Sequence, residues 1–370
     1  MNTDTPRLFV AATQQNDGKT TNSLGLFAAL QKRNLGRIGF IKPVGQRFVE
    51  VEGHRIDEDS VLMDQTFEVK TPIQAMSPIA VEPDFTRKYI EGANNEFLVR
   101  RIQNSFDRAA WEKDFVIIEG TGHAGVGSCF DLSNARVASL LSSKVLLIAG
   151  GGIGKPIDEL ALNKALFDQE GVEVVGAILN KVLPDKMDLI QNITRRGLER
   201  VGIELLGIIP EEPILAKATL GQIAKQVKGK FIGHKPDGRR RVKKIIIGAM
   251  SASHVMQHLE PGTLIVTPGD REDVILAALS TTALADTDGN AIAGLILSGD
   301  LFPHQSVMDL LHHSQLPVIA SPLDSYTVAS SIHSMTVKTL PGDTEKIDKI
   351  QRLFEQHVNV ERLMEKLKKS

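Results

Sequence analysis

The sequence predicts a doubly wound α/β fold with a mostly parallel sheet, followed by a second, smaller α/β domain. Short apolar runs alternate with helix-like segments along most of the 370 residues. The runs are nearly continuous in Val, Ile and Leu, as parallel strands covered on both faces should be. Gly36, Gly171 and Gly202 each follow a helical segment, at the position of a C-terminal glycine cap. Alternation of this kind is typical of a parallel sheet with helices on both faces.

The first domain is expected to comprise residues 1–213. Its predicted strands are 8–12, 37–41, 115–119, 144–149, 174–179 and 205–209, and its predicted helices are 20–32, 94–111, 158–170 and 186–201. The pattern changes near residue 211, where a short helical piece and a polar, basic segment over 228–241 precede a new series of elements. We therefore expect a second α/β domain over 214–342, with strands 244–249, 263–268, 291–297 and 317–320 and helices 271–284, 304–313 and 325–334.

The last segment, 343–370, is expected to form one charged amphipathic helix. Its apolar positions fall on one face at helical spacing, at Ile347, Ile350, Leu353, Phe354 and Val358. Such a helix would either close the second domain or mediate self-association, and the sequence does not decide between the two.

Composition and charge exclude several classes of function. A net charge of −2 gives no electrostatic case for a nucleic-acid or membrane partner. Cys129 is the single cysteine, so the chain can form neither an internal disulfide nor a thiolate metal cluster. The N-terminus lacks the basic start and long apolar region of a signal peptide, and no apolar stretch approaches the roughly 18 residues of a membrane span. We expect a cytoplasmic protein.

The strongest chemical signal is the run Asp17-Gly18-Lys19-Thr20-Thr21, which lies between a predicted strand and a predicted helix. A loop that opens a helix supplies backbone N–H donors and positive dipole charge to phosphate oxygens. Lys19 would neutralise the outer phosphates, and the Thr20 hydroxyl would be a magnesium ligand. The usual first glycine is absent, because Thr13 occupies the standard spacing and Ala12 the spacing one residue longer. The run predicts ATP binding with Mg²⁺; the alternative is a helix start that happens to carry a lysine.

Two further side chains stand at the carboxyl ends of predicted strands, where ligands of open α/β sheets bind. Glu119 closes the strand 115–119 and would point at the metal; the alternative is a solvated glutamate before a flexible turn. Lys42 follows the strand 37–41 and would stabilise charge on a transferred phosphoryl group; the alternative is a lysine that snorkels at a strand end. The loop after Glu119 contains Gly120, Gly122 and Gly125, which would allow the backbone to approach a substrate closely.

Together these residues resemble the dethiobiotin synthetase-like branch of P-loop proteins, which includes the cobyrinic acid diamide synthases. The family's long-spaced phosphate loop resembles Ala12-Thr13-Gln14-Gln15-Asn16-Asp17-Gly18-Lys19-Thr20, its lysine–proline pair resembles Lys42-Pro43, and its Glu-Gly-x-Gly loop resembles Glu119-Gly120-Thr121-Gly122. The likeness covers roughly residues 6–213.

The resemblance also implies roles for residues that carry no signal of their own. It implies nucleotide contacts from Thr13, Asn16, Asp17 and Gly18 through Thr21, from Asn180 to the adenine, and from Pro210 and Glu211 to the base. It implies that Asp59 helps to hold magnesium, with the neighbouring Asp57 as the alternative, and that the protein is a homodimer.

The second domain resembles the DRTGG domain, on the run Gly248-Ala249-Met250-Ser251 and the segment 261–273. The signature letters are replaced by Gly269-Asp270-Arg271-Glu272-Asp273. Both domains in this order resemble the N-terminal half of long bacterial phosphate acetyltransferases; since the transferase domain of those enzymes is absent, phosphotransacetylase activity is not expected. Gly269, Asp270 and Arg271 at a helix start also predict an anion site of their own, and the alternative is a helix capped by Asp270.

Three functions fit these predictions. The first is an ATP-dependent ligase or cyclase-type enzyme that phosphorylates a carboxylate or carbamate of a small metabolite, after which an amine displaces the phosphate. The second is a regulatory protein that senses nucleotide and metabolite and acts on acetyl-phosphate or acyl-CoA metabolism. The third is an oligomerisation module with a decayed nucleotide site. Lys19, Thr20 and the acidic residues argue against the third.

Overall fold

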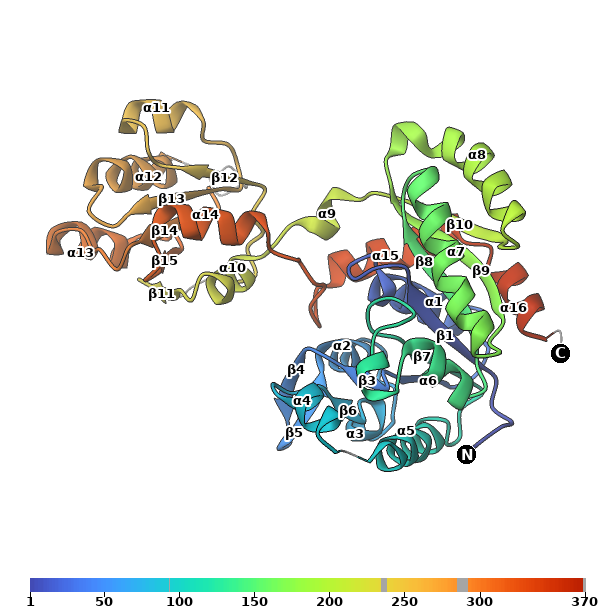
Figure 1. Cartoon of the computed structure of the whole chain (residues 1–370). Coiled ribbons are helices and arrows are strands. Elements are labelled where there is room, and N and C mark those ends of the chain that lie inside the picture. Colours follow the sequence, from blue (N-terminus) through green and yellow to red (C-terminus); the bar gives the residue numbers. More distant parts are fainter. Residues whose placement is uncertain (93, 234–237, 285–291, 369–370) are drawn as a thin grey trace. The chain divides into compact units, whose positions relative to one another are not determined.

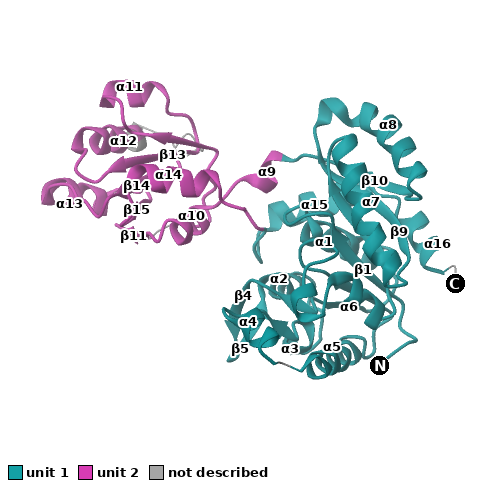
Figure 2. Cartoon of the chain, in the orientation of Figure 1, with its two compact units in different colours: residues 1–212, 339–370 teal, residues 213–338 magenta. Residues whose placement is uncertain are grey.

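The computed structural model describes residues 1–92, 94–233, 238–284 and 292–368. The chain forms two compact units, Met1–Glu212 with Thr339–Ser370 and Pro213–Lys338 (Figure 1, Figure 2). Each unit contains a sheet with helices, so the predicted α/β fold class with a second, smaller α/β domain is confirmed.

The first unit is built on a six-stranded sheet in the order β10-β9-β8-β1-β7-β2. All of its neighbouring strands pair in parallel. Every residue of β1, β2 and β7 is buried, which explains why these strands are uninterrupted apolar runs. The strands are β1 (Arg7–Ala12), β2 (Ile38–Ile41), β7 (Phe115–Glu119), β8 (Lys144–Gly150), β9 (Val174–Val182) and β10 (Leu205–Pro210).

Helices cover this sheet on both faces. On one face Phe167 of α7 joins a core cluster with alternate residues of β8, among them Val145 and Leu147. The residues between them, such as Leu146, are equally buried and point to the other face. The helices are α1 (Lys19–Lys32), α5 (Asn95–Ala109), α6 (Asn134–Leu140), α7 (Gly154–Gln169) and α8 (Met187–Arg200), with short 3₁₀ turns η1 (Ser128–Phe130) and η2 (Pro184–Lys186).

An insertion between β2 and α5 contains two small sheets that the sequence analysis did not predict. One pairs β3 with β6 in parallel and the other pairs β4 with β5 as a hairpin. Its elements are β3 (Val44–Gly45), β4 (Phe48–Val51), β5 (His54–Asp57), α2 (Glu58–Phe67), α3 (Ile73–Met76), β6 (Ile79–Ala80) and α4 (Phe85–Ile90). Strands this short carry too few residues for a periodicity to be read.

The C-terminal tail differs from the expected single helix. It forms α15 (Thr344–His357) and α16 (Val360–Lys368), separated where Val358 makes an antiparallel bridge to Gly207. The tail belongs to the first unit, because α15 packs on α1. The contact is close: a Cβ added to Gly25 would lie 2.5 Å from Cβ of Phe354. The apolar face of the tail thus completes the core of the first unit rather than closing the second.

The second unit contains a five-stranded sheet in the order β11-β15-β14-β13-β12, parallel except for β11. Two core clusters fill the space between this sheet and its helices. The strands are β11 (Lys230–Ile232), β12 (Lys244–Ile247), β13 (Thr263–Pro268), β14 (Gly294–Ser298) and β15 (Val318–Ala320); the helices are α9 (Pro213–Ala216), α10 (Leu220–Gln226), α11 (Ala252–Gln257), α12 (Glu272–Leu284), α13 (Gln305–His313) and α14 (Ser325–His333).

Parts of three predicted segments lie outside the described residues. They are residues 234–237 of the basic segment, residue 291 of the strand 291–297 and residues 369–370 of the tail. Within the described ranges, no helix combines the length and the apolar character that crossing a membrane requires.

Candidate functional site

The loop between β1 and α1 is shaped by Gly18 and closed by Asn180. Gly18 adopts φ 99°, a left-handed conformation that favours glycine. A Cβ at this position would lie 2.1 Å from Nδ2 of Asn180, so any other residue would be strained and would displace that side chain. The same Nδ2 donates a hydrogen bond of 2.8 Å to the carbonyl oxygen of Asp17. Asn180, predicted from the end of a late strand, therefore lies against the loop.

The neighbouring ends of β9 and β10 complete this edge of the loop. Lys181 donates from Nζ to the carbonyl oxygen of Asn16 at 2.7 Å, and Asn16 itself adopts a positive φ of 71°. Pro210 ends β10, and the backbone N–H of Glu211 donates to the carbonyl oxygen of Val182 at 2.7 Å. The two residues predicted to contact a base thus lie one strand away from Asn180.

Thr13, one residue after Ala12 at the standard spacing of the missing glycine, makes a hydrogen-bond network at the start of the loop. Its Oγ1 lies 2.8 Å from Oδ2 of Asp17 and 3.2 Å from Oε2 of Glu159. The backbone N–H of Gln14 also donates to Oδ2 of Asp17, at 2.8 Å. Sequence reasoning did not find Glu159, because it approaches the loop from α7 and no local pattern marks it. The start of the loop is therefore held by side chains where a glycine would allow a bare turn.

Lys19 extends from the start of α1 to the glycine loop after β7. Its Nζ donates to the carbonyl oxygen of Gly122 at 3.1 Å and to that of Gln14 at 3.4 Å. Burial lowers the pKa of Lys19 to about 8, although nearby Glu119 acts to raise it. Carbonyl oxygens are weaker partners than phosphate oxygens, so this ammonium is well placed to exchange them for an anion.

A buried cluster of charged groups lies beside Lys19. Oε1 of Glu119 accepts a hydrogen bond of 2.9 Å from Oγ1 of Thr20 and lies 3.4 Å from Nζ of Lys42. Nζ of Lys42 also pairs with Asp59 and lies 3.1 Å from Oδ1 of Asp57. The structure thus brings together Lys42, Asp59, Glu119 and Thr20 from four separate segments, and both aspartates that the sequence left as alternatives reach the lysine.

The electrostatics of this cluster follow from its burial. Burial by itself would lower the pKa of Lys42, but Asp59, Glu119 and Asp57 outweigh it and hold the pKa above its ordinary value. Burial raises the pKa of Glu119, and the charge of Lys42 opposes that rise. Within the described part of the chain, Oε2 of Glu119 is a buried oxygen with no hydrogen-bond partner. Lys42 and the neighbouring Lys19 both act on these carboxylates, and Oε2 of Glu119 remains available to a further cation.

The donor set fits a magnesium ion that arrives with a nucleotide. Among the described residues no group of three or more His, Cys, Asp and Glu side chains forms a complete metal cage. Mg²⁺ in phosphate-binding sites does not need one, because it uses one or two carboxylates together with phosphates and waters. The hydroxyl of Thr20 and the unpartnered oxygen of Glu119 are hard oxygen ligands of the kind it prefers.

Gly120 and Gly122 of the loop after β7 have structural reasons for being glycine. A Cβ on Gly120 would lie 2.7 Å from Cε1 of Phe9, and Gly122 has a positive φ of 68°. At Gly125 the nearest atom to such a Cβ is 3.5 Å away, so that position is not crowded. Nδ2 of Asn134 donates to the carbonyl oxygen of Thr121 at 2.6 Å and fixes the loop.

At the carboxyl end of β13 in the second unit, Arg271 is already paired with other groups of the same chain. Arg271 pairs with both carboxylate oxygens of Asp273, at 2.8 and 2.9 Å, and donates to the carbonyl oxygens of Gly248 and Met250. A hydrogen bond from Arg271 lowers the pKa of Asp273. A Cβ on Gly269 would lie 1.7 Å from the carbonyl oxygen of Leu301, so close packing requires glycine. Asp270 is exposed and α12 begins at Glu272. An anion here would have to compete with Asp273 for the guanidinium.

Two protein families match this chain in succession. Residues 6–219 match a family described as an AAA domain, and residues 222–335 match the DRTGG domain. Similar curated proteins include the phosphate acetyltransferase of Pseudomonas aeruginosa, 30% identical over 97% of this chain and 51% of that protein. The phosphate acetyltransferase of Nitrosomonas europaea is 27% identical with the same coverage. The chain spans about half the length of these relatives, as the predicted resemblance to their N-terminal half requires.

The similar solved structures are distant. The MinC:MinD cell division protein complex of Aquifex aeolicus matches with a TM-score of 0.37 and 15% identity, over 57% of this chain and 83% of that one. The CBS and DRTGG domains of the regulatory region of Clostridium perfringens pyrophosphatase, complexed with the activator diadenosine tetraphosphate, match with a TM-score of 0.28 and 22% identity, over 36% of this chain and 52% of that one.

Proposed function

Because the chain belongs to the AAA domain family that matches residues 6–219, we propose that its first unit binds ATP with Mg²⁺ at the loop 13–21. The observation that carries this proposal is the contact of the Thr20 hydroxyl with the buried carboxylate of Glu119 at 2.9 Å, with the ammonium of Lys19 beside it on the carbonyl oxygen of Gly122. A hydroxyl, an ammonium and a carboxylate at the start of a helix are the parts that a magnesium–triphosphate site needs.

Each residue of the site has a defined task in this proposal. Lys19 would leave its carbonyl partners to neutralise the outer phosphates, and the backbone N–H groups around Gly18 would hold phosphate oxygens. Thr20, Glu119 and Asp59 would hold Mg²⁺, which supplies charge neutralisation to the phosphates when bound. Asn180 and Glu211, at adjacent strand ends, would flank the base.

We further propose phosphoryl transfer to a carboxylate or carbamate of a small metabolite, as in an ATP-dependent ligase or cyclase. Lys42 supports this proposal, because Asp57, Asp59 and Glu119 raise its pKa and keep it charged inside the site. Phosphoryl transfer depends mainly on positioning and on charge stabilisation, which a buried, protonated lysine supplies. The glycine loop after Glu119 would carry the acceptor.

The second candidate function is regulation without catalysis. It is favoured by the DRTGG domain match over residues 222–335 and by the relatives that are named phosphate acetyltransferases. In this reading the two units respond to nucleotide and metabolite and act on acetyl-phosphate or acyl-CoA metabolism.

Thermal unfolding of the purified chain with ATP and Mg²⁺ tests the nucleotide site. Wild-type protein should be stabilised, and Lys19→Ala should abolish that stabilisation. Lys32→Ala, at the exposed end of the same helix, is the matched control and should respond as the wild type does. Equal stabilisation of Lys19→Ala and Lys32→Ala would refute the assignment.

ATP turnover across a panel of carboxylate and amine metabolites separates the two functions. Phosphate release at ordinary enzymatic rates with one acceptor would exclude a purely regulatory role. Tight nucleotide binding without turnover would count against the ligase.

We also propose self-association as a homodimer. It is supported by exposed apolar side chains of α8, where Leu189 is 54% and Ile193 43% exposed. Light scattering on the purified chain tests it, and Leu189→Glu should lower the mass if α8 lies at the contact.

A further inference from the structure

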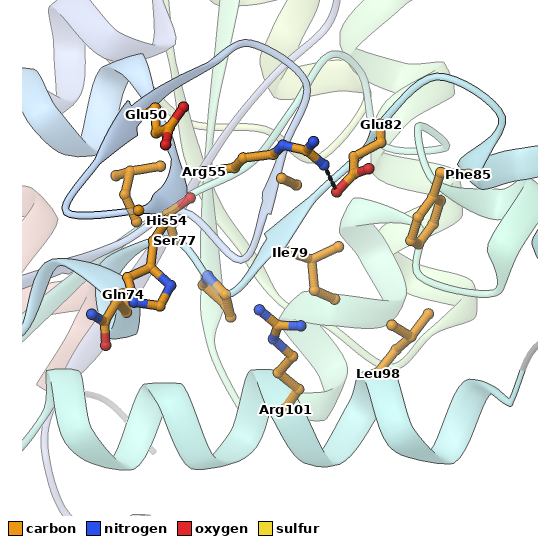
Figure 3. A pocket seen from close by; sticks show the side chains of 14 residues that line it. Glu50, His54, Arg55, Gln74, Ser77, Ile79, Glu82, Phe85, Leu98 and Arg101 are labelled. Atoms are coloured by element: carbon orange, nitrogen blue, oxygen red, sulfur yellow. Dashed lines mark ion pairs between the residues drawn. The ribbon is translucent and has the colours of Figure 1, made fainter.

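A pocket of about 490 Å³ lies in the insertion of the first unit, beside α5 and away from the phosphate loop residues. Its volume falls in the range of small-molecule sites. Figure 3 shows side chains from β4, β5, α3, β6 and α5 converging on it. The lining residues are Glu50, Gly53, His54, Arg55, Ile56, Gln74, Ser77, Pro78, Ile79, Ala80, Glu82, Phe85, Leu98 and Arg101.

Arg101 is an exposed cation of this pocket that has no protein partner among the described residues. Arg55 forms an ion pair with Glu82, so its charge is already balanced. Arg101 makes no ion pair or hydrogen bond with any group in the described ranges, and the side chain of Gln74 makes none either. Figure 3 shows Arg101 extending from α5 into the pocket, with the Arg55–Glu82 pair on the side away from that helix. A guanidinium presents a planar fork of donors that matches a carboxylate.

Six of the fourteen lining residues are apolar, and polar or charged groups form most of the wall. Leu98 and Ile79 lie to one side of Arg101 in Figure 3, and both are buried. The other apolar members are Ile56, Pro78, Ala80 and Phe85. These residues offer a smaller, apolar part of the wall to the hydrocarbon portion of a ligand that also carries a charged end.

We propose that this pocket binds a small organic monocarboxylate, with its carboxylate on Arg101 and its hydrocarbon part against Leu98 and Ile79. A doubly charged phosphate group suits the pocket less well, because Glu50 also lines it and would repel the second charge. This site does not rest on the proposed nucleotide function, since its residues are distinct from those of the phosphate loop.

The wall of the pocket is continuous with the nucleotide site. Ser77 lines the pocket, and its Oγ accepts a hydrogen bond of 2.9 Å from the backbone N–H of Asp57, the residue that pairs with Lys42. Ile79 pairs in β6 with Val44 of β3, whose carbonyl oxygen accepts a hydrogen bond from Thr121 of the glycine loop. A carboxylate that fills the pocket therefore contacts the segment that positions Lys42.

Isothermal titration of the full chain with hexanoate tests the site. Wild-type protein should bind hexanoate saturably, and Arg101→Gln should weaken the affinity roughly tenfold or more, the loss expected for a charge-assisted hydrogen bond. Arg100→Gln is the matched control: Arg100 is the next residue of α5, 75% exposed and paired with Glu96 outside the pocket. Arg100→Gln should bind hexanoate as tightly as the wild type does. Hexan-1-ol, which has no carboxylate, should bind both the wild type and Arg100→Gln more weakly than hexanoate does.

A second variant separates the apolar part of the pocket from its charge. Ala80→Leu adds volume to the lining and should weaken hexanoate binding more than acetate binding. The proposal is overturned if no straight-chain acid from acetate to octanoate binds the wild type saturably. It is equally overturned if Arg101→Gln and Arg100→Gln bind hexanoate with the same affinity. Stabilisation by ATP and Mg²⁺ should persist in Arg101→Gln, so failure of this site is distinguishable from failure of the nucleotide site.

Discussion

Replacing Lys42 with methionine measures how strongly one ammonium holds the buried carboxylate cluster together. Methionine keeps much of the volume of lysine but removes the charge that lies 3.1 Å from Asp57 and 3.4 Å from Glu119. Removing one partner of a buried ion pair leaves uncompensated charge and costs about 3 to 5 kcal/mol. Because the lysine serves three carboxylates, we expect a loss in that range. Lys164→Met removes a lysine from a surface pair with Asp168 and should cost only about 0.3 to 0.5 kcal/mol.

The loss of stability caused by Lys42→Met should be smaller at low pH. Burial raises the pKa of Glu119 and Lys42 opposes that rise, so removing Lys42 raises the pKa further. A carboxyl group with a higher pKa in the folded than in the unfolded protein binds more protons when folded, so stability increases as the pH falls through the raised pKa. In the wild type Lys42, whose pKa is itself raised, stays protonated over the same range.

Urea unfolding at about pH 8 and about pH 5 measures the free energy of unfolding of the wild type and of Lys42→Met at each pH. Lys164→Met is measured under the same conditions as the control. Adding Glu119→Gln to Lys42→Met should restore part of the stability, since it removes one of the unpaired charges. Equal free energies of unfolding for Lys42→Met and Lys164→Met at the higher pH would refute the ion-pair reading of the cluster.

Three further predictions each rest on one contact or one shifted pKa. Gly18→Ala should remove the ATP-dependent shift in melting temperature, because φ is 99° there and the new Cβ would meet Nδ2 of Asn180 at 2.1 Å; an unchanged shift would contradict the loop geometry. The pKa of Lys19 is lowered to about 8, so ATP affinity measured by titration should fall as the pH rises above that value, whereas Lys19→Arg should flatten the profile. Gly25→Val should lower the free energy of unfolding by about 1 to 3 kcal/mol by overpacking against Phe354, and a wild-type denaturation curve would argue against docking of α15 on α1.

Most strands of the two sheets could be predicted, because burial on two faces leaves a local mark, an unbroken apolar run such as β7. The edge strand β11 was not predicted, because it is short, partly exposed and lies in a polar, basic segment. The insertion after β2 could not, because β3 and β6 have two residues each and are held by pairing between distant segments. The tail illustrates the same limit. Its apolar face was visible in the sequence, but the surface that Phe354 covers depends on a glycine far away in α1, at position 25.

The site shows a similar division. Lys19, Thr20 and Glu119 could be predicted because each stands at the end of a recognisable strand or the start of a helix. The choice between Asp57 and Asp59 could not be made, since both lie at the start of α2 and the contact with Lys42 is tertiary. Glu159 left no local signal, because its role depends on α7 approaching the loop.

The carboxylate cluster explains how one site can be folded and yet remain receptive to a cation. Without Lys42, three buried carboxylates would repel one another and the strand ends that carry them would separate. With Lys42 the cluster is held together, and Oε2 of Glu119 keeps unused acceptor capacity for a metal ion. A second cation is therefore attracted without the first having to leave. In the proposed function that cation is the Mg²⁺ of the nucleotide, and Lys42 stays charged beside it to meet the transferred phosphoryl group.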